Sequence, residues 1–285
     1  MQHYPQSTLY VVATPIGNLA DISLRALHVL QLVDAIACED TRHTQTMLRQ
    51  YGIADKALLA LHEHNEVEAA GHVIERLQRG ERVAYVSDAG TPAVSDPGAR
   101  LVAAAQSAGL RVMPLPGASS VTAALSVAGL VGGDHSSAFV FAGFLPSKAG
   151  ERERAVQGLA RESRAVVILE APHRIEGLAR ALAALAGRPV TVGRELTKQF
   201  EEIATMPAEV LAAWLQAAAT RTRGEFVLVL HPVADLPPAQ DCTRLLQLLM
   251  AELPLKSAVR LAADISGLGK NELYDAALKL KGSHE

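Results

Sequence analysis

The sequence predicts an α/β fold of two successive α/β domains, residues 1–116 and 117–232, followed by a small helical tail over residues 241–285. Short apolar runs alternate with longer segments of helical periodicity, a pattern typical of a mostly parallel sheet covered by helices on both faces. A Pro-Gly pair marks the boundary between the two series of elements. The stretch 232–240 contains three prolines and predicts a linker before the tail.

The first series predicts five strands and four helices. Glycines 52 and 80 follow two of these helices, as expected for residues just past a helix end. The expected strands cover residues 9–13, 35–38, 57–61, 83–86 and 110–115. The expected helices cover residues 22–32, 41–50, 67–77 and 100–108.

The second series repeats the alternation, and the tail adds three short helices. The expected strands cover residues 139–142, 166–169, 190–193, 203–205 and 226–230, with helices over 119–130, 151–159, 174–185 and 208–218. The tail helices are expected over 242–252, 255–264 and 270–280. The glycine-containing turn before the last of them resembles that of a helix-turn-helix, although a plain helical bundle fits equally well.

Composition narrows the possible functions. The formal net charge is −3 and 49% of residues are apolar, so any nucleic-acid-binding surface has to be a local patch. No apolar stretch approaches the roughly 18 residues of a membrane span, and no signal peptide is evident. Cys38 and Cys242 lack the spacing of metal ligands, and Cys38 is expected to be a reduced core residue. We therefore expect a cytoplasmic protein.

Several common sites are absent from the sequence. No G-x-G-x-x-G follows the first strand, and there is no P-loop motif. Gly-Ala-Ser-Ser-Val at 117–121 is not a nucleophile elbow. His-Glu-His-Asn-Glu at 62–66 does not match the H-E-x-x-H zinc motif, and a solvated strand end explains it better than a metal site. We expect no metal.

The stretch from Ser87 to Gly98 is the strongest indication of a ligand site. It reads Ser-Asp-Ala-Gly-Thr-Pro-Ala-Val-Ser-Asp-Pro-Gly and lies between an expected strand and an expected helix. Two prolines stiffen it, and two glycines permit close backbone approach to a ligand. Open α/β sheets bind ligands at such strand ends, although a long connection alone is the alternative.

Polar motifs stand at the ends of several other strands. Three of them also have a simpler explanation, because Asp21 or Ser23, Asp40, and Ser119 are good helix caps. The charges that follow the motif at 141–148 also fit a plain charged helix face. The free N–H groups and hydroxyls at 116–120 suit a ligand carboxylate. The motifs lie at residues 14–23, 39–43, 116–120, 141–148 (followed by Glu-Arg-Glu-Arg at 151–154), 170–174 and 194–198.

Taken together and in this order, the central loop and these motifs resemble the tetrapyrrole methylase superfamily. More narrowly, they resemble its ribosomal RNA small-subunit methyltransferase I family. The resemblance covers residues 8–232, and the tail resembles the helix-turn-helix tail of many members. The segment 151–154 is less basic than the family pattern leads us to expect.

The resemblance implies transfer of a methyl group from S-adenosylmethionine to the ribose 2′-hydroxyl of a cytidine in the decoding region of 16S ribosomal RNA. It also implies a homodimer in which each chain folds the cofactor into a cleft between its two α/β domains. The cofactor contacts implied by the motifs are Pro15, Asp88, Ala89, Gly90, Val94, Ser119, Ser120, Leu145 and Ala171.

A ribose hydroxyl is a poor nucleophile at neutral pH, so a base or cations beside it should help. Arg42, Arg174 and Lys198 can grip RNA phosphates. Glu39 or Glu195 fits the role of general base, and the alternative is that either acid only orients those cations. The full set of catalytic candidates is Glu39, Asp40, Arg42, His173, Arg174, Glu195 and Lys198.

Two other functions stay open at this point. A methyltransferase of cobalamin or sirohaem precursors would share the fold and methylate carbon, but it has no need of the tail after residue 240. A nucleic-acid-binding regulator that senses a ligand would show no methyl transfer at all.

Overall fold

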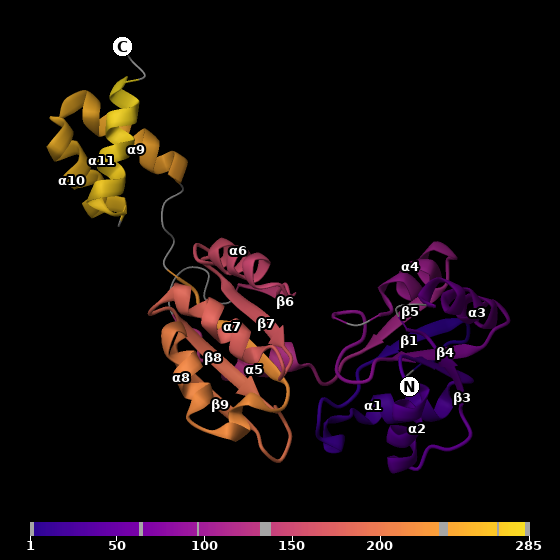
Figure 1. Cartoon of the computed structure of the whole chain (residues 1–285). Coiled ribbons are helices and arrows are strands. Elements are labelled where there is room, and N and C mark those ends of the chain that lie inside the picture. The colour runs from indigo at the N-terminus through magenta and orange to yellow at the C-terminus, as the bar shows by residue number, and fades with distance from the viewer. Residues whose placement is uncertain are drawn as a thin grey trace.

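The chain forms two five-stranded sheets, each with its own helices, and three C-terminal helices (Figure 1). The computed structural model describes residues 3–62, 65–95, 97–131, 138–233, 239–266 and 268–282. Asp96 of the predicted ligand loop and His64 lie outside these residues. No helix in this part of the chain is both long and apolar enough to cross a membrane.

The first sheet is wholly parallel, with strand order β3-β2-β4-β1-β5, as the alternation of elements predicts. Its strands are β1 (Thr8–Val12), β2 (Ala35–Cys38), β3 (Ala57–Ala60), β4 (Arg82–Val86) and β5 (Arg111–Leu115). The accompanying helices are α1 (Leu24–Leu32), α2 (Thr41–Gln50), α3 (Glu66–Gln78) and α4 (Ala99–Ser107).

Alternate residues of one strand enter two cores on opposite faces of this sheet, because side chains alternate along a strand. Tyr10 of β1 packs in one core with Val29 of α1, whereas Leu9 packs in the other with Val73 of α3. Cys38 is buried and unpaired, as expected. Helices therefore cover both faces of the sheet, so a ligand site can form at the edge where the strands end.

The second sheet is mixed, with strand order β6-β7-β10-β8-β9. Its strands are β6 (Phe139–Phe144), β7 (Ala165–Glu170), β8 (Pro189–Arg194), β9 (Glu202–Pro207) and β10 (Phe226–Leu230). Only β6 and β7 pair in parallel, so the mostly parallel arrangement does not extend to this sheet. The link from β8 to β9 is too short for a crossover helix, so the chain turns back as a hairpin. The crossover that follows keeps β10 in this reversed direction.

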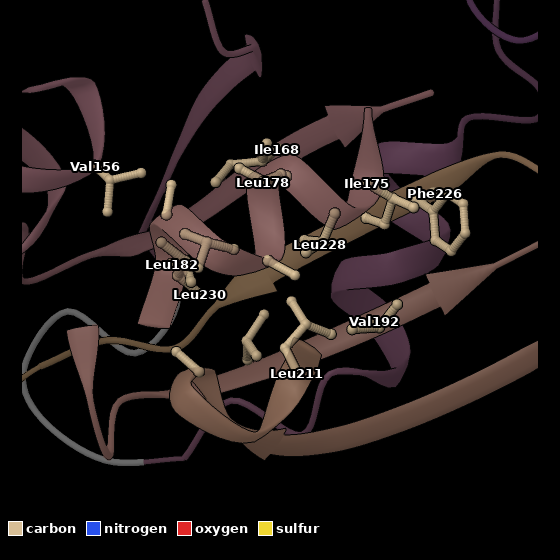
Figure 2. Close-up of a cluster of buried hydrophobic side chains, with 14 of the residues drawn as sticks. Val156, Ile168, Ile175, Leu178, Leu182, Val192, Leu211, Phe226, Leu228 and Leu230 are labelled. Carbon is tan, nitrogen blue, oxygen red and sulfur yellow. The ribbon is translucent and has the colours of Figure 1, made fainter. Parts of the chain in front are cut away.

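Helices cover both faces of the second sheet. Figure 2 shows Leu178 and Leu211 packed against Ile168, Leu228 and their neighbours. On the other face, Val121 and its helix pack on inward residues of β7 and β10. The helices are α5 (Ser120–Val127), α6 (Ala149–Leu159), α7 (Ile175–Leu182) and α8 (Leu211–Gln216).

The tail contains the three expected helices, α9 (Ala239–Glu252), α10 (Leu255–Ser266) and α11 (Lys270–Gly282). Leu246 and Val259 are among the side chains of its small common core. The limits at residues 116, 117, 232 and 241 that we expect for the domains stay a prediction.

Candidate functional site

Three loops at the carboxyl edge of the first sheet are joined by hydrogen bonds. They follow the adjacent strands β4, β1 and β5. Thr14 and Gly90 exchange backbone hydrogen bonds of 2.9 and 3.0 Å. The Thr14 hydroxyl donates to the carbonyl of Ser87 (3.1 Å), and the Thr91 hydroxyl donates to that of Ala118 (3.2 Å). The predicted ligand loop, the Pro15 turn and the segment 116–120 therefore form one wall.

The predicted ligand loop is fixed where it enters α4. Gly98 has φ +117°, and a Cβ atom there would lie 2.1 Å from Cε1 of Tyr85. The Tyr85 hydroxyl donates to the carbonyl of Pro97. Glu66 of α3 accepts the N–H groups of Gly98 (2.9 Å) and Arg100 (3.2 Å), and thereby caps α4 from outside its own sequence. The loop thus has anchors at both ends.

A cavity of about 300 Å³ lies between this wall and the second sheet; we call it the main cavity. Apolar side chains from the second sheet, such as Phe141, Leu169 and Val227, form much of the opposite wall. Six of the predicted cofactor contacts line it: Ala89, Gly90, Val94, Ser119, Ser120 and Ala171. An apolar cavity with a few hydroxyls and free backbone N–H groups is typical of small-molecule sites.

A second cavity of about 380 Å³ adjoins the main cavity. The two share Ile16, Ala89 and Glu225. Pro15 and Asp88, which the resemblance implies as cofactor contacts, line the second cavity and not the main one. Leu145 is not among the described residues that line either cavity.

A cluster of three charged side chains stands at the boundary of the second cavity. The Lys198 ammonium lies 2.8 Å from Glu195 Oε1 and 2.9 Å from Glu225 Oε2. The stem of Lys198 crosses to the first sheet, where a Cβ atom on Gly17 would lie 2.3 Å from its Cγ. Thus the motifs at 14–23 and 194–198 meet, although Glu195 itself is not among the described residues that line the second cavity.

The cluster keeps its charges. Burial disfavours the ionised form of Glu195, but the Lys198 ammonium and the Glu225 N–H hold the pKa of its carboxyl below the usual value. Burial similarly opposes the charge of Lys198, yet the two carboxylates raise the pKa of its ammonium. Lys198 is therefore a cation at neutral pH and not a base.

Glu225 lines both cavities but is not among the residues predicted from the sequence. In a parallel sheet, the polar residues at the site edge follow the strands, and Glu225 does not follow one. Because β10 is antiparallel to β7 and β8, its first residue, Phe226, pairs with the last residues of both, Glu170 and Arg194. Glu225 precedes a strand and yet reaches the same edge. A prediction of the short hairpin after β8 could have found it.

Glu170 and Arg174 hold the second-domain wall of the main cavity. The Arg174 Nε lies 2.9 Å from Oε1 of Glu170, whose side chain is fully buried. The same oxygen accepts the N–H of Ala171 (2.9 Å), and the Arg174 guanidinium donates to the carbonyl of Leu145. Arg174 is thus engaged with the protein, while the neighbouring His173 is exposed.

The motif at 39–43 begins a helix beside the site. Asp40 caps α2 by accepting the N–H groups of Arg42 (2.8 Å) and His43 (3.4 Å). Hydrogen bonds from the Arg42 guanidinium and backbone lower the pKa of Asp40 to about 2. The N–H of Asp40 donates to Asp88 Oδ1 (3.2 Å), which ties the motif to the ligand loop. Glu39 and Arg42 are not among the described residues lining either cavity.

The described residues contain no group of three or more side chains suited to hold a metal ion. His62, the first residue of the histidine-rich stretch, lies among them, but Glu63 and His64 lie outside.

Comparison with known proteins gives the same family over nearly the whole chain. Residues 8–212 match the model of tetrapyrrole (corrin/porphyrin) methylases, and residues 237–281 match that of the RsmI C-terminal HTH domain. The chain is similar to two proteins named ribosomal RNA small subunit methyltransferase I. It is 47% identical to that of Pseudomonas aeruginosa, with 96% of this chain and 98% of the relative covered. It is 46% identical to that of Escherichia coli O157:H7, with 97% of this chain and 96% of the relative covered.

Among solved structures, uroporphyrin-III C-methyl transferase from Thermus thermophilus complexed with S-adenyl homocysteine shares the fold. It has a TM-score of 0.54 and 18% identity, and the match covers 79% of this chain and 97% of that one. The chain therefore belongs to the tetrapyrrole methylase family and, within it, to the ribosomal RNA small subunit methyltransferase I group.

Proposed function

We propose that this methyltransferase transfers a methyl group from S-adenosylmethionine to the ribose 2′-hydroxyl of a cytidine in 16S ribosomal RNA. The observation that carries the proposal is similarity to small-subunit ribosomal RNA methyltransferases that includes the tail as well as both sheets. A tetrapyrrole methyltransferase has less support, because the solved example reported above covers only 79% of the chain.

The main cavity suits the cofactor. Its apolar walls can pack against an adenine ring, and the first N–H groups of α5 with the hydroxyls of Ser119 and Ser120 can bind a carboxylate. Gly90 has φ +79°, so its backbone faces the cavity without a side chain in the way. When bound, S-adenosylmethionine supplies a methyl group already activated on a sulfonium.

The residues at the boundary of the two cavities would act on the hydroxyl. The Lys198 ammonium can stabilise negative charge that develops on the oxygen. Both carboxylates contact Lys198, but Glu225 is 75% exposed in its side chain and can accept the proton. Glu195 is 20% exposed, and its Oε1 accepts from both the Lys198 ammonium and the Glu225 N–H. We therefore favour Glu225 as the base and Glu195 as the residue that positions Lys198.

We further propose a cytoplasmic homodimer, which the family resemblance implies. Sedimentation velocity of the full chain measures the assembly directly. A single species of about 60 kDa, twice the 30.2 kDa chain mass, supports the dimer, and a 30 kDa species contradicts it.

Parallel labelling tests the proposed function. The protein is incubated with S-adenosylmethionine labelled in the methyl group and with small ribosomal subunits, free 16S RNA or a tetrapyrrole precursor. We expect label in the RNA of one or both ribosomal samples. Label in the precursor would indicate a carbon methyltransferase, and no label anywhere would indicate a regulator.

A further inference from the structure

One face of α2 has no part in the cofactor cavity, yet it lines the second cavity. His43, Thr46, Met47 and Gln50 recur at the spacing of one helical face and all contribute to the lining. Thr46 donates its hydroxyl to the carbonyl of Arg42 within the helix. Among the described residues, no hydrogen bond engages the Gln50 carboxamide. This face therefore offers polar groups to a ligand.

The second cavity lies where a methyl acceptor would have to bind. Ile16, Ala89 and Glu225 belong to both cavities, so a ligand in the second lies directly against a ligand in the main one. A methyl acceptor must come within about 3–3.5 Å of the methyl group and in line with the bond that breaks. Glu225, which lines both cavities, lies 2.9 Å from Lys198, so this pair stands close to where the two ligands would meet.

The charges of the second cavity disfavour a phosphate inside it and favour a neutral group. Its lining contains the carboxylates of Asp88 and Glu225 against the single ammonium of Lys198, which lies 2.9 Å from Glu225. Phosphate sites instead collect unpaired cations and backbone N–H groups. The neutral base of a nucleotide meets no such repulsion.

We propose that the second cavity holds the acceptor nucleoside of the RNA, with its ribose at the Lys198–Glu225 boundary and its base against α2. The inference rests on the proposed function. A pyrimidine with an amino group presents one donor and two acceptors, and a carboxamide such as Gln50 offers both kinds of partner. The imidazole of His43 and the apolar surface of Leu19 can flank the ring. The nucleotide enters splayed out of any stack, as is usual in single-stranded RNA recognition.

Gln50→Ala and His43→Ala test this assignment, with Gln45→Ala as the matched control. Gln45 is exposed on the same helix but lines a different hollow, beside Asp55 and Lys56. Methylation of small ribosomal subunits is measured at saturating S-adenosylmethionine, and cofactor affinity is measured by calorimetry. We expect Gln50→Ala and His43→Ala to lower kcat/KM for subunits about 5- to 10-fold, with cofactor affinity kept and Gln45→Ala like wild type.

A second readout excludes a merely structural effect. Subunits reconstituted with uridine in place of the target cytidine are compared with normal ones. The wild-type protein should methylate cytidine-containing subunits faster than uridine-containing ones. In Gln50→Ala, the ratio of these two rates should be smaller. If both α2 variants match Gln45→Ala while wild type is active, the nucleoside assignment is wrong and the proposed function stands. If they lose cofactor affinity instead, the second cavity belongs to the cofactor. If wild type methylates no subunit, the proposed function fails and this inference fails with it.

Discussion

At the scale of single residues, the site combines side chains that face a cavity with side chains that hold others in place. Lys198 belongs to the first kind and Glu195 to the second. Arg174 was expected to grip RNA phosphates, but its guanidinium is occupied by Glu170 and the Leu145 carbonyl, behind the main cavity. We therefore expect it to position the cavity wall.

Arg174→Ala tests this expectation. Loss of the guanidinium leaves the fully buried Glu170 carboxylate without its cation, which is strongly destabilising for a buried charge. The wall of the main cavity around Ala171 should then lose its fixed position, and cofactor affinity should fall about tenfold or more. Arg174→Ala combined with Glu170→Gln should recover part of that loss, because the unpaired charge is gone. Calorimetry gives the cofactor affinity, and filter binding gives the RNA affinity. If Arg174→Ala lost only RNA affinity, Arg174 would be a phosphate-binding residue and not a residue that positions the cavity wall.

At the scale of elements, the junction of the ligand loop with α4 has a strict backbone requirement. Gly98 has positive φ and stands against the Tyr85 ring, whereas Gly109 just after α4 has φ +69° and open space around it. Substitutions at these two glycines therefore distinguish the cost of backbone strain, present at both, from the cost of a close contact, present only at Gly98.

Gly98→Ala should cost about 1–3 kcal/mol for its backbone conformation, with a further cost for the displaced Tyr85 ring. Gly109→Ala should show the backbone cost alone. Thermal unfolding measures both, and only Gly98→Ala should also weaken cofactor binding. Equal losses of stability with unchanged cofactor affinity in both variants would mean that the loop does not depend on this anchor.

The sequence allowed the elements of the first sheet to be predicted because apolar alternation and turn residues are local signals. The strand-end motifs could be placed at one edge for the same reason, and the Thr14, Gly90 and Ala118 segments do meet there. The direction of β10 depends on the hairpin between β8 and β9, which lies far from β10 in the sequence. Local patterns do not reveal this direction, so Glu225 could not be predicted. Local spacing also could not show that Arg174 turns toward Leu145.

At the scale of the whole molecule, the tail has its own apolar core around Leu246, Val259 and Leu273. Residues 237–281 also match a family model of their own, that of the RsmI C-terminal HTH domain. We expect the tail to contact RNA or the ribosomal subunit and the two sheets to bind the cofactor.

Deletion of residues 241–285 should leave S-adenosylmethionine affinity intact, because both cavities are lined by residues before position 230. Binding to small subunits should weaken. A deletion variant that methylates subunits at the wild-type rate would show that the tail has another purpose. Aggregation of the variant would point to packing or assembly.

We propose that the two adjoining cavities bring the cofactor methyl group to a ribose oxygen of 16S RNA, and a labelled methyl group tests this directly. Small subunits are incubated with the protein and S-adenosylmethionine that carries a trideuterated methyl group, and the RNA is digested to nucleosides for mass spectrometry. We expect one cytidine per 16S chain with the heavy methyl group on its ribose, and we expect Lys198→Ala to abolish this label. A heavy methyl group on a base, or none in the RNA, would contradict it.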